Sequence, residues 1–305
     1  MINIAPVAVF AYNRLAHLKN LLDSLSANQY AEETPVVIFL DGPRNDYDRD
    51  QQVDILKMLK HEFPFKSLEI ITSTENRGLA NSISSGVTKM LEANSRVIVL
   101  EDDLLLSPSF LGFMNRGLEI YENCLEVASI HGFQYPIKGN FTEPVFLRGA
   151  DCWGWGTWRD RWALVSFDAH KLIDKIIDLN LVEAFNLSGD IDYFGLLQKQ
   201  AMGEVDSWAI CWHASMFLQE KLTLFPPASL VQNTGNDGSG VHSGVNSHFQ
   251  TELGSYYEWK FPMVIEESSD FRNSLGDFFR SSLGKKNFFI RVTRKIAQMF
   301  RSGKL

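Results

Sequence analysis

Residues 97–110 have the sequence VIVLEDDLLLSPSF, in which four apolar residues run directly into Glu101, Asp102 and Asp103. The apolar run predicts a buried strand. A single acid at the end of such a strand is explained by capping of the next helix. Three adjacent carboxylates repel one another, so we expect a positive charge to lie beside them.

The chain before these acids alternates between strand and helix patterns. Buried strands are predicted close to residues 6–14, 34–41, 67–78 and 96–103, and apolar residues at helical spacing fill residues 15–25, 51–63 and 79–93. This alternation predicts right-handed βαβ units and an α/β fold, in which a mostly parallel central sheet has helices on both faces. In such sheets ligands bind beyond the carboxyl ends of the strands.

Polar residues follow all four predicted strands, and we expect them to converge on one rim. They are Asn13 with Arg14, Asp41, residues 75–77, and residues 101–103. Mg²⁺ and Mn²⁺ take oxygen ligands and commonly lie between carboxylates and substrate phosphates, so the acids predict a metal and phosphate site. The absence of GxxxxGK[ST], and of GxGxxG after the first strand, disfavours kinases, P-loop NTPases and Rossmann-type dehydrogenases.

Composition restricts the class of protein further. The 305 residues contain no run of 18 apolar residues, and the start MINIAPVAVFAYNR has neither the basic residues nor the cleavage site of a secretory signal. We therefore expect a cytoplasmic protein. The three cysteines, Cys124, Cys152 and Cys211, have no CxxC spacing, which predicts reduced thiols and disfavours a zinc site.

Charge is distributed unevenly along the chain. Residues 271–305 hold nine Lys or Arg and one acid, whereas the rest holds twenty basic and thirty-six acidic residues. The acidic body disfavours nucleic acid as a partner. In the tail, apolar residues recur at helical spacing between basic ones, which suits a helix lying on an anionic membrane. A helix docked on the body or on another protein is the alternative.

Four tryptophans lie within ten residues of the segment LRGADCWGWGTWRDRW. We expect a packed aromatic corner to account for at least two of them, while exposed indole faces suit the apolar face of a sugar ring. Glycines let the backbone approach a ligand closely, and Asp151 or Asp160 would bind sugar hydroxyls. The tryptophans are Trp153, Trp155, Trp158 and Trp162, and the glycines are Gly149, Gly154 and Gly156.

Asp206 stands two residues before Trp208, at the start of an apolar helical run. Its carboxylate has two interpretations, a helix cap or a general base. Group transfer with inversion needs a carboxylate that takes a proton from the attacking hydroxyl, and such a base contributes about 10²–10⁴ in rate. From the residues alone the two interpretations stay open, and Glu204 is a second candidate for a base.

Residues 235–244, GNDGSGVHSG, predict a glycine-rich loop that could exclude water from a bound donor. His242 within it would close over a diphosphate or approach the metal, and a solvated surface histidine is the equal alternative. His213 lies in an apolar run and is assigned to the core or to the lining of an acceptor pocket.

Together these motifs resemble the nucleotide-sugar-dependent glycosyltransferases of the GT-A fold. The closest likeness is to inverting enzymes of the N-acetylglucosaminyltransferase I kind, and a looser one is to glycosyltransferase family 2, over about residues 5–245. The carriers are AYNR, Asp41, ENRGLANSISSG, LEDDLLLSPSFLGFM, the tryptophan segment and EVDSW, with LTLFPPASLVQNTG and GVHSG after it. The order of His and Ser in GVHSG departs from that of the closest relatives.

The resemblance implies a role for each matching residue. Asp103 would bind a Mn²⁺ or Mg²⁺ ion with the donor diphosphate, supported by Glu101 and Asp102, and His242 would be a further metal ligand. Asp206 would be the catalytic base, and Asp41 would hydrogen-bond the nucleobase. The other donor-binding residues implied are Asn13, Arg14, Asn76, Arg77, Gly78, Asn81, Trp153, Gly154 and Trp155.

The sequence thus predicts a GT-A domain over residues 1–262, divided into a nucleotide-sugar half (1–110) and an acceptor half (111–262), and a basic tail over 263–305. The expected activity is inverting, metal-dependent transfer from a UDP-sugar to a hydroxyl of a glycan or lipid-linked acceptor, in surface polysaccharide synthesis. The tail would contact the inner face of the membrane. A sugar nucleotidyltransferase and a catalytically silent carbohydrate-binding protein are the alternatives.

Overall fold

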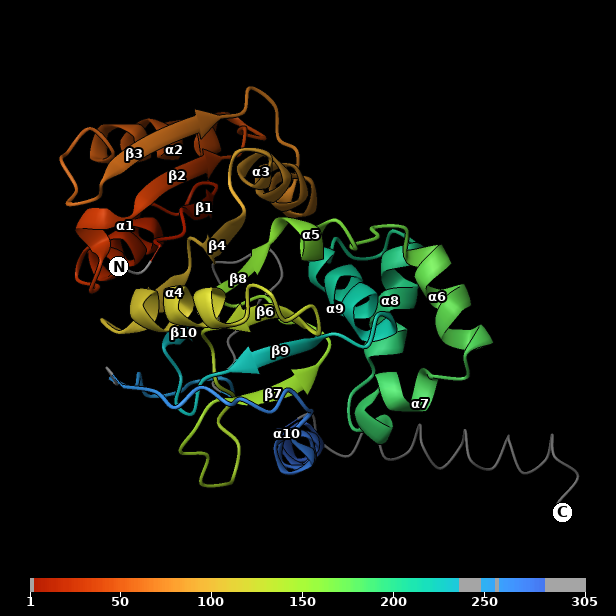
Figure 1. The fold of residues 1–305 in the computed structure, drawn as a ribbon. Coiled ribbons are helices and arrows are strands. Elements are labelled where there is room, and N and C mark those ends of the chain that lie inside the picture. Colours follow the sequence, from red (N-terminus) through yellow and green to blue (C-terminus); the bar gives the residue numbers. More distant parts are fainter. Residues whose placement is uncertain (1–2, 236–247, 256–257, 283–305) are drawn as a thin grey trace, which may run out of the picture.

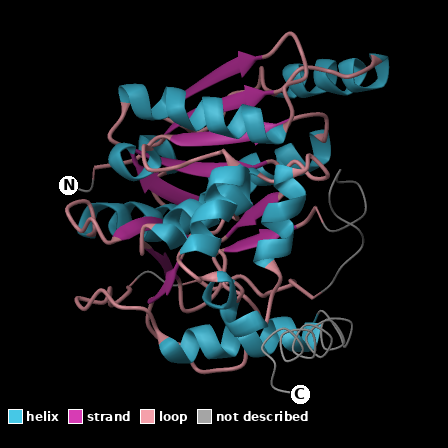
Figure 2. Ribbon diagram, turned by 90° about the vertical axis from the view of Figure 1, so that its right-hand side faces the viewer, coloured by secondary structure: helices cyan, strands magenta, loops and turns pink. Residues whose placement is uncertain are grey.

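The computed structural model describes residues 3–235, 248–255 and 258–282. Within these ranges eight strands form one sheet in the order β3-β2-β1-β4-β8-β6-β9-β7, which runs from top to bottom in Figure 1. Helices pack on both faces of the sheet, as Figure 2 also shows. The α/β fold with a mostly parallel sheet is therefore confirmed.

The first half of the sheet is parallel. Its strands are β1 (Val7–Ala11), β2 (Pro35–Leu40), β3 (Ser67–Thr72) and β4 (Arg96–Glu101), and β1 pairs with both β2 and β4. The connecting helices are α1 (Leu15–Ser26), α2 (Asp46–Met58) and α3 (Leu79–Ala93), with the short 3₁₀ turn η1 (Ala31–Glu33) before β2. All five β1 residues are buried, because both faces of this parallel strand are covered.

The second half of the sheet contains both parallel and antiparallel strands. Strand β8 (Trp155–Trp158) inserts antiparallel between β4 and β6 (Val127–His131), and β9 (Leu222–Phe225) lies between β6 and β7 (Val145–Arg148). Helix α4 (Phe110–Ile120) connects the two halves. A separate antiparallel pair joins β5 (Leu104–Leu106) to β10 (Val231–Asn233), which brings residues 231–235 beside the acids that end β4.

Most helices of the second half form a layer to the right of the sheet in Figure 1. They pack around a small apolar core of their own that includes Phe185, Leu197 and Ile210. The helices around this core are α6 (Ala169–Asp178), α7 (Val182–Phe185), α8 (Tyr193–Ala201) and α9 (Trp208–Leu218). The short elements α5 (Arg159–Trp162) and η2 (Leu187–Gly189) bury Trp162 and Leu187 in other apolar clusters.

Helix α10 (Ser269–Ser282) lies along the lower edge of the sheet in Figure 1. Its residues Phe271 and Leu275 are buried against Leu147 and Phe225 of strands β7 and β9. Residues 269–282 are therefore packed on the body. The rest of the basic tail, 283–305, is outside the described residues, as is His242. None of the described helices has the length and apolar character needed to cross a membrane.

Candidate functional site

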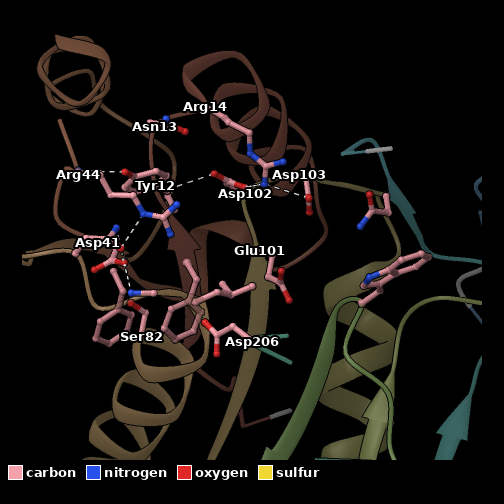
Figure 3. Close-up of a pocket in the computed structure, with 18 residues that line it drawn as sticks. Tyr12, Asn13, Arg14, Asp41, Arg44, Ser82, Glu101, Asp102, Asp103 and Asp206 are labelled. Carbon is pink, nitrogen blue, oxygen red and sulfur yellow. Dashed lines mark hydrogen bonds and ion pairs between the residues drawn. The ribbon is translucent and has the colours of Figure 1, made fainter. Parts of the chain in front are cut away.

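A cleft of about 330 Å³ opens at the carboxyl ends of β1, β2 and β4 (Figure 3). The N-terminus of α3 forms one wall. Three segments of the second half complete it through Trp153, Asp206 and Asn233. We call this the strand-end cleft, and its position is the one at which parallel α/β sheets bind ligands.

The cleft brings together most of the residues singled out from the sequence. Lining residues among them are Asn13, Arg14, Asp41, Asn76, Gly78, Glu101, Asp102, Asp103, Trp153 and Asp206. The cleft lining does not include Arg77, Asn81, Gly154, Trp155 or the second-choice base Glu204. Tyr12, Arg44, Ser82 and Asn233 also line it and were not predicted.

The acid cluster, Glu101, Asp102 and Asp103, has a protein cation beside it. The Arg14 guanidinium donates to Asp102 Oδ1 and, at 3.1 Å, to Asp103 Oδ2. Burial disfavours charged Arg14, but the two carboxylates outweigh it and raise the pKa of Arg14. The positive charge expected from the sequence is therefore supplied at least in part by Arg14, which ends the loop from β1 to α1 as the N-cap residue of α1.

One arginine does not balance three carboxylates. Burial, with the charges of Asp103 and Asp102, raises the pKa of Glu101 to about 8. Burial also raises the pKa of Asp102, although Arg14 acts in the opposite direction. Asp103 Oδ1 is buried and accepts no hydrogen bond within the described ranges.

These features fit a further cation at the cluster. An unused buried carboxylate oxygen and an excess of negative charge are what an oxygen-seeking Mg²⁺ or Mn²⁺ requires. In the part of the chain that is described, no three His, Cys, Asp or Glu side chains are arranged to hold a metal by themselves. Mg²⁺ is often held by one or two carboxylates together with substrate phosphates.

The other side of Asp103 is closed by the chain after β10. Both the N–H and the hydroxyl of Thr234 donate to the Asp103 carbonyl at 2.8 Å. Gly235 follows directly, and a Cβ there would lie 2.2 Å from Asp103 Oδ2. The segment QNTG thus sets the position of Asp103 from 131 residues away.

Asp41 lies at the opposite end of the cleft from Asp103 (Figure 3). It is 9% exposed, and its carboxylate accepts hydrogen bonds from the N–H groups of Arg77 and Gly78 and from the Asn76 amide. Asp41 therefore holds the loop at residues 75–78, immediately before α3. Asn81 lies one turn into α3, is exposed, and donates to the Arg77 carbonyl.

A second polar network lies beside this loop. Tyr12 donates to the buried Asp48, which also accepts from Asn13 Nδ2 at 2.7 Å. Burial alone would raise the pKa of Asp48, but hydrogen bonds from Tyr12, Asn13 and the Arg44 N–H lower it below its usual value. The sequence DGPRNDYD predicts a turn, but it gave no indication that Arg44 and Asp48 take part in a site.

The tryptophan segment divides between cleft and core. Trp153 lines the cleft, and its backbone N–H donates to His131 Nε2 at 3.1 Å. Trp155 is fully buried and packs against Trp208 and Trp212. The expectation that Trp155 contacts the donor is therefore wrong, because no ligand reaches a side chain in that core.

Gly154, His213 and Asp151 are also held by contacts within the protein. Gly154 is buried, its carbonyl accepts from the Gly132 N–H, and a Cβ on it would lie 2.7 Å from Val231. Gly154 is therefore packed in the core and does not line the cleft. His213 is buried, its Nδ1 lies 2.8 Å from the Ala150 carbonyl, and burial lowers its pKa, so it is a core residue. Asp151 accepts from Tyr135 and from the Cys152 N–H.

Asp206 reaches the cleft from the loop before α9. Its carboxylate is exposed and lies near Gly78, where a Cβ would be 3.2 Å from Asp206 Oδ2. The helix-cap interpretation is not borne out, since α9 begins after Ser207 without a side-chain cap. Figure 3 shows Asp206 and Glu101 projecting into the same space from different parts of the chain.

A parallel sheet with acids at the end of its fourth strand, facing a carboxylate from the second half, defines a GT-A type of glycosyltransferase fold. The family model described as Glycosyl transferase family 2 matches residues 7–143, which include the acid cluster. This match covers less than half of the chain and supports a family 2-like glycosyltransferase of the GT-A fold, which is the looser of the two likenesses inferred from the sequence. No curated protein sequence matches the chain.

Several solved structures align with part of this chain at low identity. The mannosyltransferase PcManGT from Pyrobaculum calidifontis, in complex with GDP-Man and Mn²⁺, is 16% identical over 45% of this chain and 39% of its own, with a TM-score of 0.31. S. aureus TarS is 14% identical over 46% of this chain and 24% of its own, with a TM-score of 0.33. Its fragment 1–349 is 13% identical over 52% and 48%, with a TM-score of 0.33. The chain spans less than half of each of these structures.

Proposed function

We propose that this protein is an inverting, metal-dependent glycosyltransferase that moves a sugar from a nucleoside diphosphate to an acceptor hydroxyl. The observation that carries the proposal is the strand-end cleft itself, in which an acid cluster with an unused oxygen faces the carboxylate of Asp206. This arrangement suits a reaction in which the acid cluster binds the leaving diphosphate through a metal ion and Asp206 takes a proton from the acceptor.

In this mechanism Asp206 accepts the proton of the acceptor hydroxyl as that oxygen attacks the anomeric carbon. The bond to the diphosphate breaks on the opposite face, so one displacement inverts the anomeric centre. Asp103, with Glu101 and Asp102, would hold a Mn²⁺ or Mg²⁺ ion, which supplies Lewis-acid stabilisation of the leaving diphosphate. Trp153 lies where its indole would cover one face of a sugar ring.

The finer assignments rest on the sequence. UDP is the favoured nucleotide through the resemblance, and a glycan or lipid-linked acceptor in polysaccharide synthesis fits the basic tail. Residues 283–305 contain seven Lys or Arg and no acid. Removing them, with α10 left in place, is expected to abolish binding to anionic vesicles without loss of donor binding. Unchanged vesicle binding would refute the membrane role.

Donor binding is the direct test of the proposed function. UDP-, GDP- and dTDP-sugars would be titrated by calorimetry with Mn²⁺ and with a chelator, into the wild-type protein, Asp103→Ala and the control Asp54→Ala. Asp54 is on the exposed side of α2, where it pairs with Lys57. We expect metal-dependent binding of one nucleotide, lost only in Asp103→Ala. Absence of binding to every donor would refute the proposal.

A further inference from the structure

The Asp41 carboxylate has its hydrogen-bonding capacity filled by its own chain. Oδ1 accepts from the N–H groups of Gly42 and Arg77, both at 2.9 Å. Oδ2 accepts from Asn76 Nδ2 at 3.1 Å and from the Gly78 N–H at 3.0 Å. A carboxylate offers about four acceptor sites. With four donors in place and 9% exposure, Asp41 has little left for a ligand.

These bonds join two loops into one unit. Asn76 also donates to the Gly42 carbonyl at 2.8 Å, and a Cβ on Gly42 would lie 2.3 Å from the Glu75 carbonyl carbon. Gly78, the N-cap of α3, has φ of 77°, a left-handed conformation that glycine adopts readily. The loops after β2 and β3 are therefore held in one geometry, with Asp41 at their centre.

Arg44 lines this end of the cleft and has unused polar groups. Its guanidinium lies over the Tyr12 ring at 5.5 Å, and Nε donates to Asn76 Oδ1 at 3.0 Å. The two terminal nitrogens of Arg44 have no hydrogen-bond partner among the described residues. Guanidinium groups only donate, so this end of the cleft presents donors and not a carboxylate acceptor.

The acid cluster and Arg44 lie at opposite ends of the cleft (Figure 3). If the diphosphate is bound at the acids, as the proposed function requires, the nucleobase extends toward Arg44. The geometry points to Arg44 as the residue that selects the base, by donating to a ring carbonyl, and to Asp41 as a positioning residue that does not contact the base. This inference rests on the proposed function and replaces the expected contact between Asp41 and the base.

A guanidinium that donates to a ring carbonyl distinguishes bases that carry a carbonyl from bases that carry an amino group at the same ring position. Uracil and guanine present a carbonyl where cytosine and adenine present an amino group, which cannot accept from Arg44. A good polar contact to a base edge discriminates by roughly tenfold or more. We therefore expect UDP to bind at least about tenfold more tightly than CDP, or GDP than ADP, according to which ring size the cleft admits.

The test titrates UDP, CDP, GDP, ADP and inorganic pyrophosphate into the wild-type protein, Arg44→Met and the control Arg49→Met. Arg49 is an exposed arginine in the first turn of α2, five residues after Arg44, and pairs with Asp46. In Arg44→Met, UDP and CDP should bind with nearly equal affinity, as should GDP and ADP, and pyrophosphate binding should be unchanged. An equal loss for all ligands, pyrophosphate included, would make Arg44 a phosphate contact and overturn the inference.

Amide hydrogen exchange tests the role of Asp41 separately. In the ligand-free protein the N–H groups of Arg77 and Gly78 should be protected, and Asp41→Asn should remove that protection. In the wild-type protein, adding the preferred nucleotide should leave it unchanged or increase it. Faster exchange at these two amides on binding would mean that the base takes over the Asp41 oxygens, and would refute the positioning role. If the wild-type protein binds no nucleotide, the proposed function fails, and the inference fails with it.

Discussion

Arg14 and Asp103 form an ion pair, with Nη2 3.1 Å from Oδ2, although they lie 89 residues apart in the sequence. The same guanidinium also contacts Asp102, so a single side chain connects the end of β1 with the end of β4. The second oxygen of Asp103 stays buried without a hydrogen bond in the described structure. The acid cluster is therefore preorganised by the protein and only partly neutralised.

Replacement of Arg14 is expected to expose this imbalance. Arg14→Gln leaves two mostly buried carboxylates without their cation, so the free energy of unfolding should fall by about 1–3 kcal/mol. Mn²⁺ should then stabilise the variant more than the wild-type protein, since it relieves a greater repulsion. Urea unfolding with and without Mn²⁺ measures both effects, with the exposed Lys19→Gln as control. Equal Mn²⁺ stabilisation of both proteins would contradict this account.

The proposed base is tested by two neighbouring acids. Asp206→Asn keeps the shape of the side chain but removes its basicity, so transfer should fall by about 10²–10⁴ while donor binding is retained. Glu204→Gln is the matched control, because Glu204 is exposed and does not line the cleft. Steady-state kinetics together with calorimetry separates the two effects. Near-normal transfer by folded Asp206→Asn would exclude it as the base.

Trp153 and Trp155 should respond to truncation in opposite ways. Trp155→Ala opens a cavity among buried indoles and should cost about 3–5 kcal/mol of stability. Trp153→Ala removes a partly buried ring from the cleft wall, so it should unfold nearly like the wild type but bind donor sugar more weakly. Thermal unfolding compares the stability of the two variants. Titration with the sugar nucleotide and with the free nucleotide compares how much each variant loses of the binding to the sugar. A sugar-independent loss in Trp153→Ala would argue against stacking.

The Asp48 network predicts a dependence of stability on pH. Its folded-state pKa is lowered, so its contribution is fully present above the unfolded value of about 4 and is lost as the pH falls through the lower folded value. Asp48→Asn should therefore destabilise the protein at pH 7 and differ less from the wild type near pH 3. Urea unfolding of both proteins at several pH values measures this difference. A difference that grows toward low pH would contradict the assignment.

The parallel half of the sheet could be predicted from the sequence because strands buried on both faces form continuous apolar runs. Strand β4 and helix α3 lie where their patterns placed them. The second half could not be predicted in the same way, since the antiparallel insertion of β8 between β4 and β6 depends on contacts distant in sequence. The charge and periodicity of the tail left a docked helix and a membrane-bound helix as alternatives, and only the packing of Phe271 and Leu275 on the sheet shows that α10 is docked.

The candidate site was predictable where a residue follows a strand. The acids predicted a nearby cation, but the sequence does not show that Arg14 reaches Asp102 and Asp103 across 88 and 89 residues. Asp41 was located correctly at the rim. The sequence could not show that the loop at residues 75–78 fills the hydrogen-bonding capacity of the Asp41 carboxylate. Every residue except proline has a backbone N–H, so the donors to Asp41 can be identified only from the structure.

The contact between Gly235 and Asp103 gives a test of the acid cluster that leaves every carboxylate in place. A Cβ at residue 235 would lie 2.2 Å from Asp103 Oδ2, so Gly235→Ala must displace a side chain that Arg14 holds. We expect metal-dependent donor binding to weaken by about tenfold or more, since a shifted carboxylate no longer meets the ion in good geometry. Calorimetry with Mn²⁺ measures this loss. Gly112→Ala is the control, because its nearest contact would be an ordinary 3.5 Å. Unchanged Mn²⁺-dependent binding in Gly235→Ala would show that the position of Asp103 does not govern the metal, and would move that role toward Glu101.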